Sequence, residues 1–373
     1  MKRISLRSTW ALLLGISFSV AACTKEVEKI VVKEVDKVHS WTTVARFAGN
    51  YNIFLSMGQG PNGLYLQQPG GFLALEQSNG RVVAQQYSAP VTSDVNVRLP
   101  IGPNFFVTYH DSVLIIIPNH HSVMGQFYRR IHLKQLDPQA RQVLAPGMSY
   151  QKFGAINSNS YFLFGYLGTN MYIDNAMHLV LAQVPPFERS DRWPLPIPKP
   201  RLITIPITGY QTYPSMPTYI SAIDNYFLVD CGHRGVYRIE ENGSYRQVLR
   251  EQQYVTAFYK WKGRVYAHTS DGRIGMSDDD GLSWRFVFLS SDGLRFSTMY
   301  ALGDSLVGVY RGHGGGLFTL RWNNQGARLR QLDDDGLNRA DVNGLEVWRD
   351  TVYMATTAGL FKRPMSKFFG SKK

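Results

Sequence analysis

The sequence predicts an all-β protein built from a repeated unit, and three observations support this. Aromatic residues are abundant, with 21 tyrosines, 20 phenylalanines and 7 tryptophans. Short runs of β-branched and aromatic residues alternate with Gly, Asn, Asp and Pro, and no long stretch has the apolar spacing of a helix. The C-terminal half repeats at a spacing near 40 residues, which is the size of one four-stranded blade. We therefore predict a β-propeller.

The repeat is defined by short matching segments that share one offset of 43 residues. Asp292-Gly293-Leu294 recurs as Asp335-Gly336-Leu337, and Gly316-Leu317-Phe318 recurs as Gly359-Leu360-Phe361. A single blade exposes two apolar faces, and packing each face against a neighbour around a ring covers both.

Seven units of this kind can be placed along the chain, although six or eight blades also fit the spacing. Besides the two units of the 43-residue repeat, they cover residues 53–87, 105–144, 156–207, 220–249 and 254–289. The third unit contains a proline-rich interruption that we expect to form a loop, since proline removes strand hydrogen bonds. Residues 40–47 resemble the outer strand of other units and would complete the last blade. The predicted propeller covers residues 41–366, followed by a basic tail over 367–373.

The N-terminus has the layout of a secretory signal, which we predict to cover residues 1–22. Three cationic residues precede an apolar run over 11–20, which is too short for a membrane span. The run ends in Val20-Ala21-Ala22-Cys23. This segment resembles the lipobox of bacterial lipoproteins, and the resemblance implies lipidation of Cys23 after cleavage. An ordinary signal peptide with a nearby cysteine is the alternative.

The lipobox resemblance implies a cell-envelope location with the chain held to a membrane through lipid on Cys23. Two or three acyl chains anchor a protein stably where one does not. Residues 23–40 would then form a charged tether. The residue after the cysteine is Thr24 rather than the Asp that holds lipoproteins of enteric bacteria in the inner membrane. The resemblance therefore implies the outer membrane, with the periplasmic and surface faces both open.

The chain is basic, with a formal net charge of +12, and removal of the three signal-peptide cations leaves +9. Such a surface can attract anionic partners. The arginines are scattered and no nucleic-acid motif accompanies them, so we expect no nucleic-acid partner. Once Cys23 is lipidated, Cys231 is the single remaining cysteine and cannot form an internal disulfide. We interpret it as a buried strand residue and expect a monomer.

One motif is specific. The segment Ser277-Asp278-Asp279-Asp280-Gly281-Leu282-Ser283-Trp284 fits the pattern Ser-x-Asp-x-Gly-x-Ser/Thr-Trp. It resembles the Asp-box, or BNR repeat, of sialidase-like propellers, which lies in the turn between the third and fourth strands of a blade. We expect Asp279 to cap backbone N–H groups of a tight turn, Gly281 to supply a positive φ, and Trp284 to pack into the blade. The resemblance implies a structural role for Ser277, Asp279, Gly281, Ser283 and Trp284.

No coherent catalytic set is visible. Arg98-Leu99-Pro100 matches a short sialidase motif, but the other two arginines and the Tyr/Glu pair of sialidases cannot be placed. Other glycosidases need two carboxylates. The candidates are Asp94, Asp111, Asp174, Glu188 and Asp230.

Metal chemistry is not indicated either. Asp333-Asp334-Asp335-Gly336 lacks the spaced oxygen ligands of a calcium loop. Two pairs of possible ligands are adjacent in sequence, namely His110-Asp111 and His120-His121. Neighbouring side chains on a strand point to opposite faces, so at most one residue of each pair could join a metal site. We expect no cofactor and no metal.

The sequence therefore favours a non-catalytic binding or scaffold module for a glycan, a peptide or an envelope protein. The alternative is a divergent glycoside hydrolase or lyase of the sialidase-like propeller type.

Overall fold

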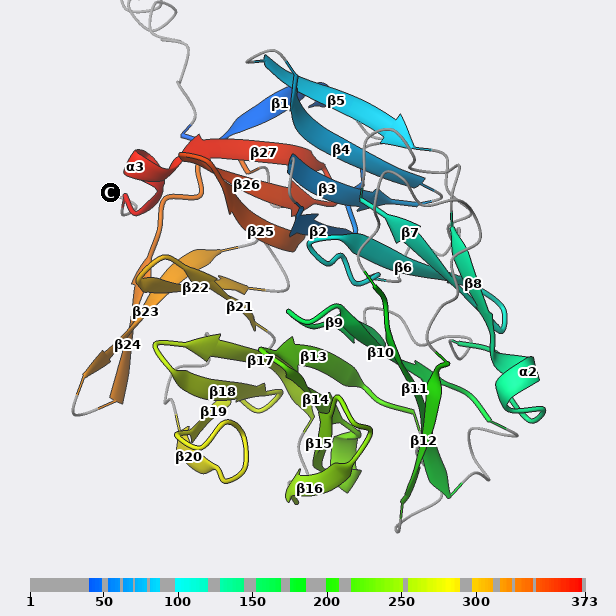
Figure 1. Cartoon of the computed structure of the whole chain (residues 1–373). Coiled ribbons are helices and arrows are strands. Elements are labelled where there is room, and N and C mark those ends of the chain that lie inside the picture. The colour runs from blue at the N-terminus through cyan, green and yellow to red at the C-terminus, as the bar shows by residue number, and fades with distance from the viewer. Residues whose placement is uncertain are drawn as a thin grey trace, which may run out of the picture. The chain divides into compact units, whose positions relative to one another are not determined.

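Seven antiparallel sheets follow one another along the chain and stand as blades around a common centre (Figure 1). The computed structural model describes residues 40–48, 53–60, 63–69, 71–78, 81–87, 98–119, 128–143, 152–168, 175–185, 199–207, 216–250, 254–288, 297–310, 316–323, 326–337 and 340–370. All of them belong to one compact unit, Ser40–Lys373. The predicted all-β propeller of seven blades is confirmed.

The first three blades contain eleven described strands. Blade 1 holds β2 (Ser56–Gln59), β3 (Gly63–Gln68), β4 (Gly71–Ser78) and β5 (Arg81–Tyr87). Blade 2 holds β6 (Phe105–His110), β7 (Val113–Pro118) and β8 (Arg129–His132). Blade 3 holds β9 (Gly154–Ile156), β10 (Tyr161–Tyr166), β11 (Ala176–Gln183) and β12 (Arg201–Pro206).

The next three blades have four strands each. Blade 4 holds β13 (Tyr219–Ile223), β14 (Tyr226–Asp230), β15 (Val236–Glu240) and β16 (Tyr245–Leu249). Blade 5 holds β17 (Val255–Trp261), β18 (Arg264–Thr269), β19 (Arg273–Ser277) and β20 (Arg285–Phe288). Blade 6 holds β21 (Ser297–Leu302), β22 (Ser305–Tyr310), β23 (Leu317–Asn323) and β24 (Gly326–Gln331).

Blade 7 combines the two ends of the propeller. It holds β25 (Val342–Trp348), β26 (Thr351–Thr356), β27 (Gly359–Pro364) and, as its outer strand, β1 (Thr42–Ala48). Thr42 pairs with Lys362 and Thr43 with Phe361. The predicted closure of the last blade by an N-terminal strand is thus confirmed.

The second strand of a blade lies deepest in the core. All five residues of β14 are buried, as are the last five residues of β7 and of β26. The outer strand β16 has no fully buried residue. A continuous apolar run is therefore the sequence mark of the second strand, since neighbouring blades cover both of its faces.

Blade 2 is irregular at its inner edge. Ile101 forms an isolated bridge to Phe106, and the Gly102 N–H donates to the Phe105 carbonyl at 2.9 Å. Pro100 and Pro103 flank this segment, and neither has the N–H that a regular ladder needs. The chain before β6 therefore takes the place of an inner strand without forming a regular one.

The start of β1 is held by the turn that follows β24. The Trp41 indole Nε1 donates to the Asp333 carbonyl at 3.1 Å, and the Trp41 N–H donates to the Asp335 carbonyl at 3.0 Å. The acidic run 333–336 is therefore part of the ring closure.

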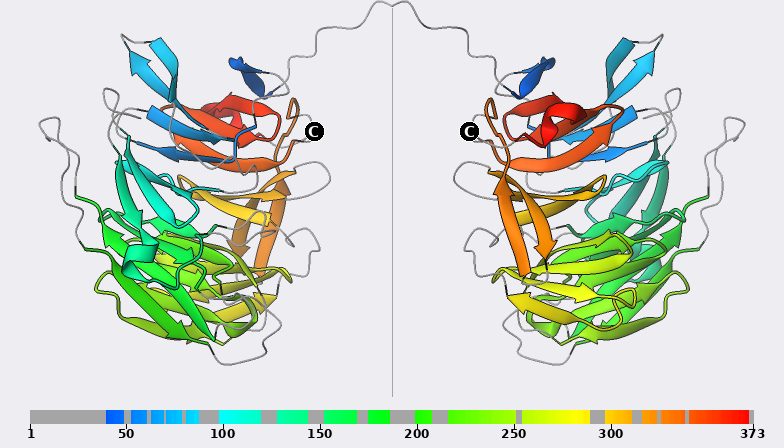
Figure 2. Two further views of the ribbon diagram at one scale, coloured as in Figure 1. Left: turned by 90° about the vertical axis from the view of Figure 1, so that its right-hand side faces the viewer. Right: turned by 90° about the vertical axis from the view of Figure 1, so that its left-hand side faces the viewer.

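The helices are short. They are α2 (Leu133–Leu136), on the outer side of the ring in Figures 1 and 2, the 3₁₀ turn η1 (Gly232–Arg234), and α3 (Met365–Phe368). Phe368 is fully buried, and its ring meets that of Trp41 edge-on at 5.8 Å. The packed chain thus continues into the start of the expected basic tail. Within the described ranges, no helix is long and apolar enough to cross a membrane.

Candidate functional site

A cavity of about 390 Å³ lies where the inner edges of the seven blades meet. Its lining comes from β2, β9, β13, β17, β21 and β25, which surround the centre of the ring in Figure 1, and from the irregular segment before β6. Every blade therefore contributes to one shared cavity.

Arg98 is the arginine of this lining, and backbone contacts fix its position. The next residue, Leu99, donates its N–H to the Gln67 side-chain oxygen at 2.8 Å. The Arg98 guanidinium donates through Nη2 to Asn343 Oδ1 at 2.5 Å. Asn343 in turn donates through Nδ2 to the Phe54 carbonyl at 2.7 Å. The Arg98 side chain therefore links the segment before β6 in blade 2 to β25 in blade 7.

Glu346 is the acidic residue of the described lining. Gln59 Nε2 donates to Glu346 Oε2 at 3.1 Å and to the Val347 carbonyl at 2.5 Å. Burial raises the pKa of Glu346 to about 7, although the Gln59 hydrogen bond and the charge of Lys152 act in the opposite direction. Its carboxyl group therefore changes charge near neutral pH.

Lys152 is the second cation of the cavity. Its carbonyl accepts the Ile220 N–H at 2.8 Å, which fixes the backbone beside β13. Its Nζ lies 5.9 Å from the centre of the Tyr219 ring, within the range of a cation–π contact. Burial and the charge of Arg98 lower the pKa of Lys152, and Glu346 raises it.

The cavity thus combines charged groups with an apolar wall. Met57, Phe258, Met299 and Leu345 are among its lining residues, together with the three charged side chains. Its volume is typical of small-molecule sites, which measure roughly 300–1,000 Å³. Charges in such a low-dielectric cleft act more strongly on a ligand than charges on an open surface.

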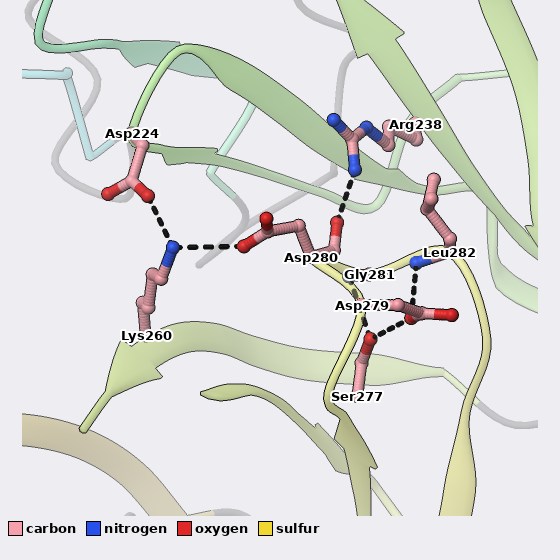
Figure 3. Close-up of polar contacts among 8 residues, drawn as sticks. All are labelled: Asp224, Arg238, Lys260, Ser277, Asp279, Asp280, Gly281 and Leu282. Atoms are coloured by element: carbon pink, nitrogen blue, oxygen red, sulfur yellow. Dashed lines mark hydrogen bonds and ion pairs between the residues drawn. The ribbon is translucent and has the colours of Figure 1, made fainter. Parts of the chain in front are cut away.

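The turn predicted from the specific motif lies between β19 and β20 (Figure 3). Asp279 Oδ1 accepts the N–H groups of Leu282 and Ser283 at 3.1 and 2.9 Å, and Gly281 has φ +82°. The Ser277 hydroxyl accepts the Gly281 N–H at 2.8 Å and donates to Asp279 at 2.7 Å. The pKa of Asp279 is lowered first by the hydrogen bond that the Ser283 hydroxyl donates to it at 2.6 Å, and then by those from Ser277 and from the two backbone N–H groups. Trp284 packs on the core cluster shared by blades 4 and 5.

The same turn connects blade 5 to blade 4 (Figure 3). Lys260 on β17 lies 2.5 Å from an Asp224 carboxylate oxygen and 2.9 Å from one of Asp280. Arg238 on β15 donates to the Asp280 carbonyl. None of these residues lines the cavity.

The other sequence candidates do not gather in one place. Asp230 is fully buried and burial raises its pKa to about 7, but it lies outside the cavity lining. Asp111 is exposed beside His110 at 3.3 Å. Cys231 is buried, and burial raises its thiol pKa to about 12. Cys23, Asp94, Asp174, Glu188, His120 and His121 lie outside the described residues.

The charged residues that line the cavity differ from the site residues predicted from the sequence. Arg98 reaches the cavity, whereas its partners there, Lys152 and Glu346, were missed by sequence reasoning. The signal that could have found them is their place on or beside the first strand of a repeat unit. In the described part of the chain, no group of three or more His, Cys, Asp or Glu side chains could hold a metal ion.

No protein-family model and no curated protein matches the chain. Among solved structures, YCF48 bound to D1 peptide has a TM-score of 0.50 at 10% identity, covering 88% of this chain and 98% of that chain. PorZ of Porphyromonas gingivalis, described as an essential surface component of the type-IX secretion system, has a TM-score of 0.46 at 12% identity, covering 90% of this chain and 39% of that chain. BamB from Moraxella catarrhalis has a TM-score of 0.41 at 10% identity, covering 84% of each chain. The TM-score of 0.50 shows that this chain is similar in fold to YCF48 over most of both chains.

Proposed function

We propose that this chain is a lipid-anchored protein of the cell envelope whose propeller binds a ligand in its central cavity. The observation that carries the proposal is the cavity itself, because all seven blades line it and it holds Arg98, Lys152 and Glu346 beside apolar side chains. A glycan, a peptide or a segment of another envelope protein could supply such a ligand.

The test is a panel of glycans and peptides, scored by the shift in the melting temperature of the full chain. We expect at least one compound to raise it, since a ligand that binds only the folded state stabilises that state. Ala222→Trp should abolish the shift, because Ala222 lines the cavity. Ala301→Trp, at an exposed position of β21, is the matched control and should leave the shift unchanged. A panel without any active compound would contradict the proposal.

One observation bears on the alternative, glycoside hydrolysis. Burial raises the pKa of Glu346 to about 7, which suits a general acid that works at neutral pH. A two-carboxylate mechanism needs a second acid about 5–9.5 Å away. Within the described lining, Glu346 is the only carboxylate. Mass spectrometry of the bound compound decides the matter: recovery of the unchanged compound supports binding, and appearance of a hydrolysed product supports the enzyme.

We also propose that Cys23 carries the lipid, on the strength of the apolar run and the Val20–Cys23 segment. Cys23→Ser should leave an unlipidated precursor that no longer fractionates with membranes. Thr24→Ser, which keeps the cysteine, should fractionate as the wild type does. The mass of the N-terminal peptide measures the modification directly, and a Cys23→Ser chain with an acylated N-terminus would refute the assignment.

Finally, we infer that the 277–284 turn is a structural Asp-box. Its internal hydrogen bonds and its links to blade 4 support this role.

A further inference from the structure

Among the described residues, the ammonium group of Lys152 forms no ion pair, and its half-buried side chain lines the central cavity. No carboxylate of the described residues lies within 4 Å of Lys152 Nζ, which stands 5.9 Å from the centre of the Tyr219 ring. A buried charge is costly unless it is paired or hydrogen-bonded. A group that arrives with a ligand would remove this cost.

The neighbouring charges indicate the sign of that group. The ammonium of Lys152 lies close enough to the guanidinium of Arg98 for the two cations to repel each other, which contributes to the lowered pKa of Lys152. An anion placed between the two cations would relieve the repulsion and pair with both. The guanidinium of Arg98 is held in the lining by its hydrogen bond to Asn343 Oδ1.

The protonation state of Glu346 controls how strongly the cavity attracts an anion. It interacts with Lys152 across the cavity, and its carboxyl group is held by Gln59 rather than by an ion pair. Arg98, Lys152 and Glu346 are the charged groups of the described lining, and Tyr219 and Tyr300 are its tyrosines. When Glu346 is protonated the cavity carries an excess of positive charge, and when Glu346 is ionised it competes with an incoming anion.

We propose that Arg98 and Lys152 form a carboxylate-binding subsite in the central cavity, for a ligand whose remaining body packs on the apolar wall, with Glu346 weakening binding when it is ionised. This inference rests on the proposed binding function and names the chemical class of the ligand. Two sources carry this chemistry, namely an acidic sugar and a peptide with a free C-terminus.

The test uses isothermal titration of the purified full chain with two acids and their uncharged counterparts. The probes are glucuronate against glucose, and N-acetylphenylalanine against its amide. We expect at least one acid to bind about tenfold more tightly than its counterpart, because a buried hydrogen bond to a charged group is worth at least that factor. The acid that binds identifies the source.

Three variants locate the subsite. Lys152→Met keeps the aliphatic stem and should weaken binding of the acid by about tenfold or more. Lys134→Met removes the same charge from the exposed face of α2 and should change nothing. Glu346→Gln should tighten binding at pH 8, where the wild-type carboxylate is ionised, and should reduce the weakening of binding between pH 6 and pH 8. Circular dichroism of each variant confirms that it is folded.

The outcomes separate the two proposals. Equal affinity for an acid and its counterpart, or unchanged binding in a folded Lys152→Met chain, would overturn the carboxylate subsite. If only an uncharged compound of the wider panel binds, the subsite is refuted while the binding function stands. If nothing in either panel binds, both proposals fail.

Discussion

A single carboxylate organises the turn between β19 and β20. Asp279 accepts two backbone N–H groups and two hydroxyl groups from residues within its own turn. Such local capping satisfies donors that the strand ladder leaves unpaired. Asp279 itself is exposed, so its own contribution to stability comes from these hydrogen bonds rather than from buried apolar area.

Asp279→Ala should therefore lower the free energy of unfolding by about 1 kcal/mol, the usual value of a few partly exposed hydrogen bonds. The contribution should depend on pH. Since folding lowers the pKa of Asp279, its stabilisation is fully present above the ordinary aspartate value of 3.8 and is lost as the pH falls through the folded-state value.

Urea denaturation at pH 7 and at pH 3 measures both effects. Asp278→Ala is the matched control, because it removes an adjacent exposed carboxylate whose partner is Arg264. Exposed ion pairs contribute about 0–1 kcal/mol. A loss as large in Asp278→Ala as in Asp279→Ala would show that charge, and not the turn, is responsible.

At the scale of elements, β1 is the strand that closes the ring. Trp41 directly precedes it, is buried, and lies in one core cluster with residues of blades 6 and 7. The indole also donates to the Asp333 carbonyl. The closing strand is therefore held by one large side chain as well as by its pairing with β27.

Trp41→Ala should destabilise the protein by about 3–5 kcal/mol, the range for removing a fully buried aromatic ring. Trp348→Ala removes a tryptophan from the same blade that is only partly buried against a different cluster, and it should cost less. Thermal unfolding of the two variants makes the comparison. Equal losses would mean that Trp41 has no special part in closure.

Many of the strands and turns can be predicted from the sequence, whereas most residues of the candidate site cannot. The apolar run 226–230, the strand 40–47 and the turn 277–284 are all local patterns, and the structure contains a strand or turn at each. Lys152 and Glu346 are different, because they lie on separate blades and the ring brings them together. Arg98 depends on a segment that two prolines keep from forming a regular strand, so the 43-residue repeat does not reveal its position.

At the scale of the whole molecule, the core encloses the one cysteine of the described chain. Cys231 lies in a cluster shared by blades 3 and 4, and burial raises its thiol pKa to about 12. The thiolate is the reactive form of cysteine. Reaction therefore requires the blades to separate.

We expect Cys231 to resist a maleimide reagent in the folded protein and to react once denaturant unfolds it. The Cys23→Ser background removes the only other cysteine, so mass spectrometry then counts one thiol. Labelling of the folded chain should proceed no faster than unfolding. Rapid labelling of the folded chain would mean that the blades around Cys231 open readily.

Ring closure also determines when β1 can pair during synthesis of the chain. The pairing of β1 with β27 joins residues 320 positions apart, as in the contact of Thr42 with Lys362. Ribosomes add about 5–20 residues per second, so the time between the synthesis of β1 and that of β27 is on the order of tens of seconds. During that interval the edge of β1 is open to other chains. The first strand of the propeller to be synthesised is thus among the last to be paired. Until β27 has been made, the unpaired edge of β1 must be covered by something other than its partner strand.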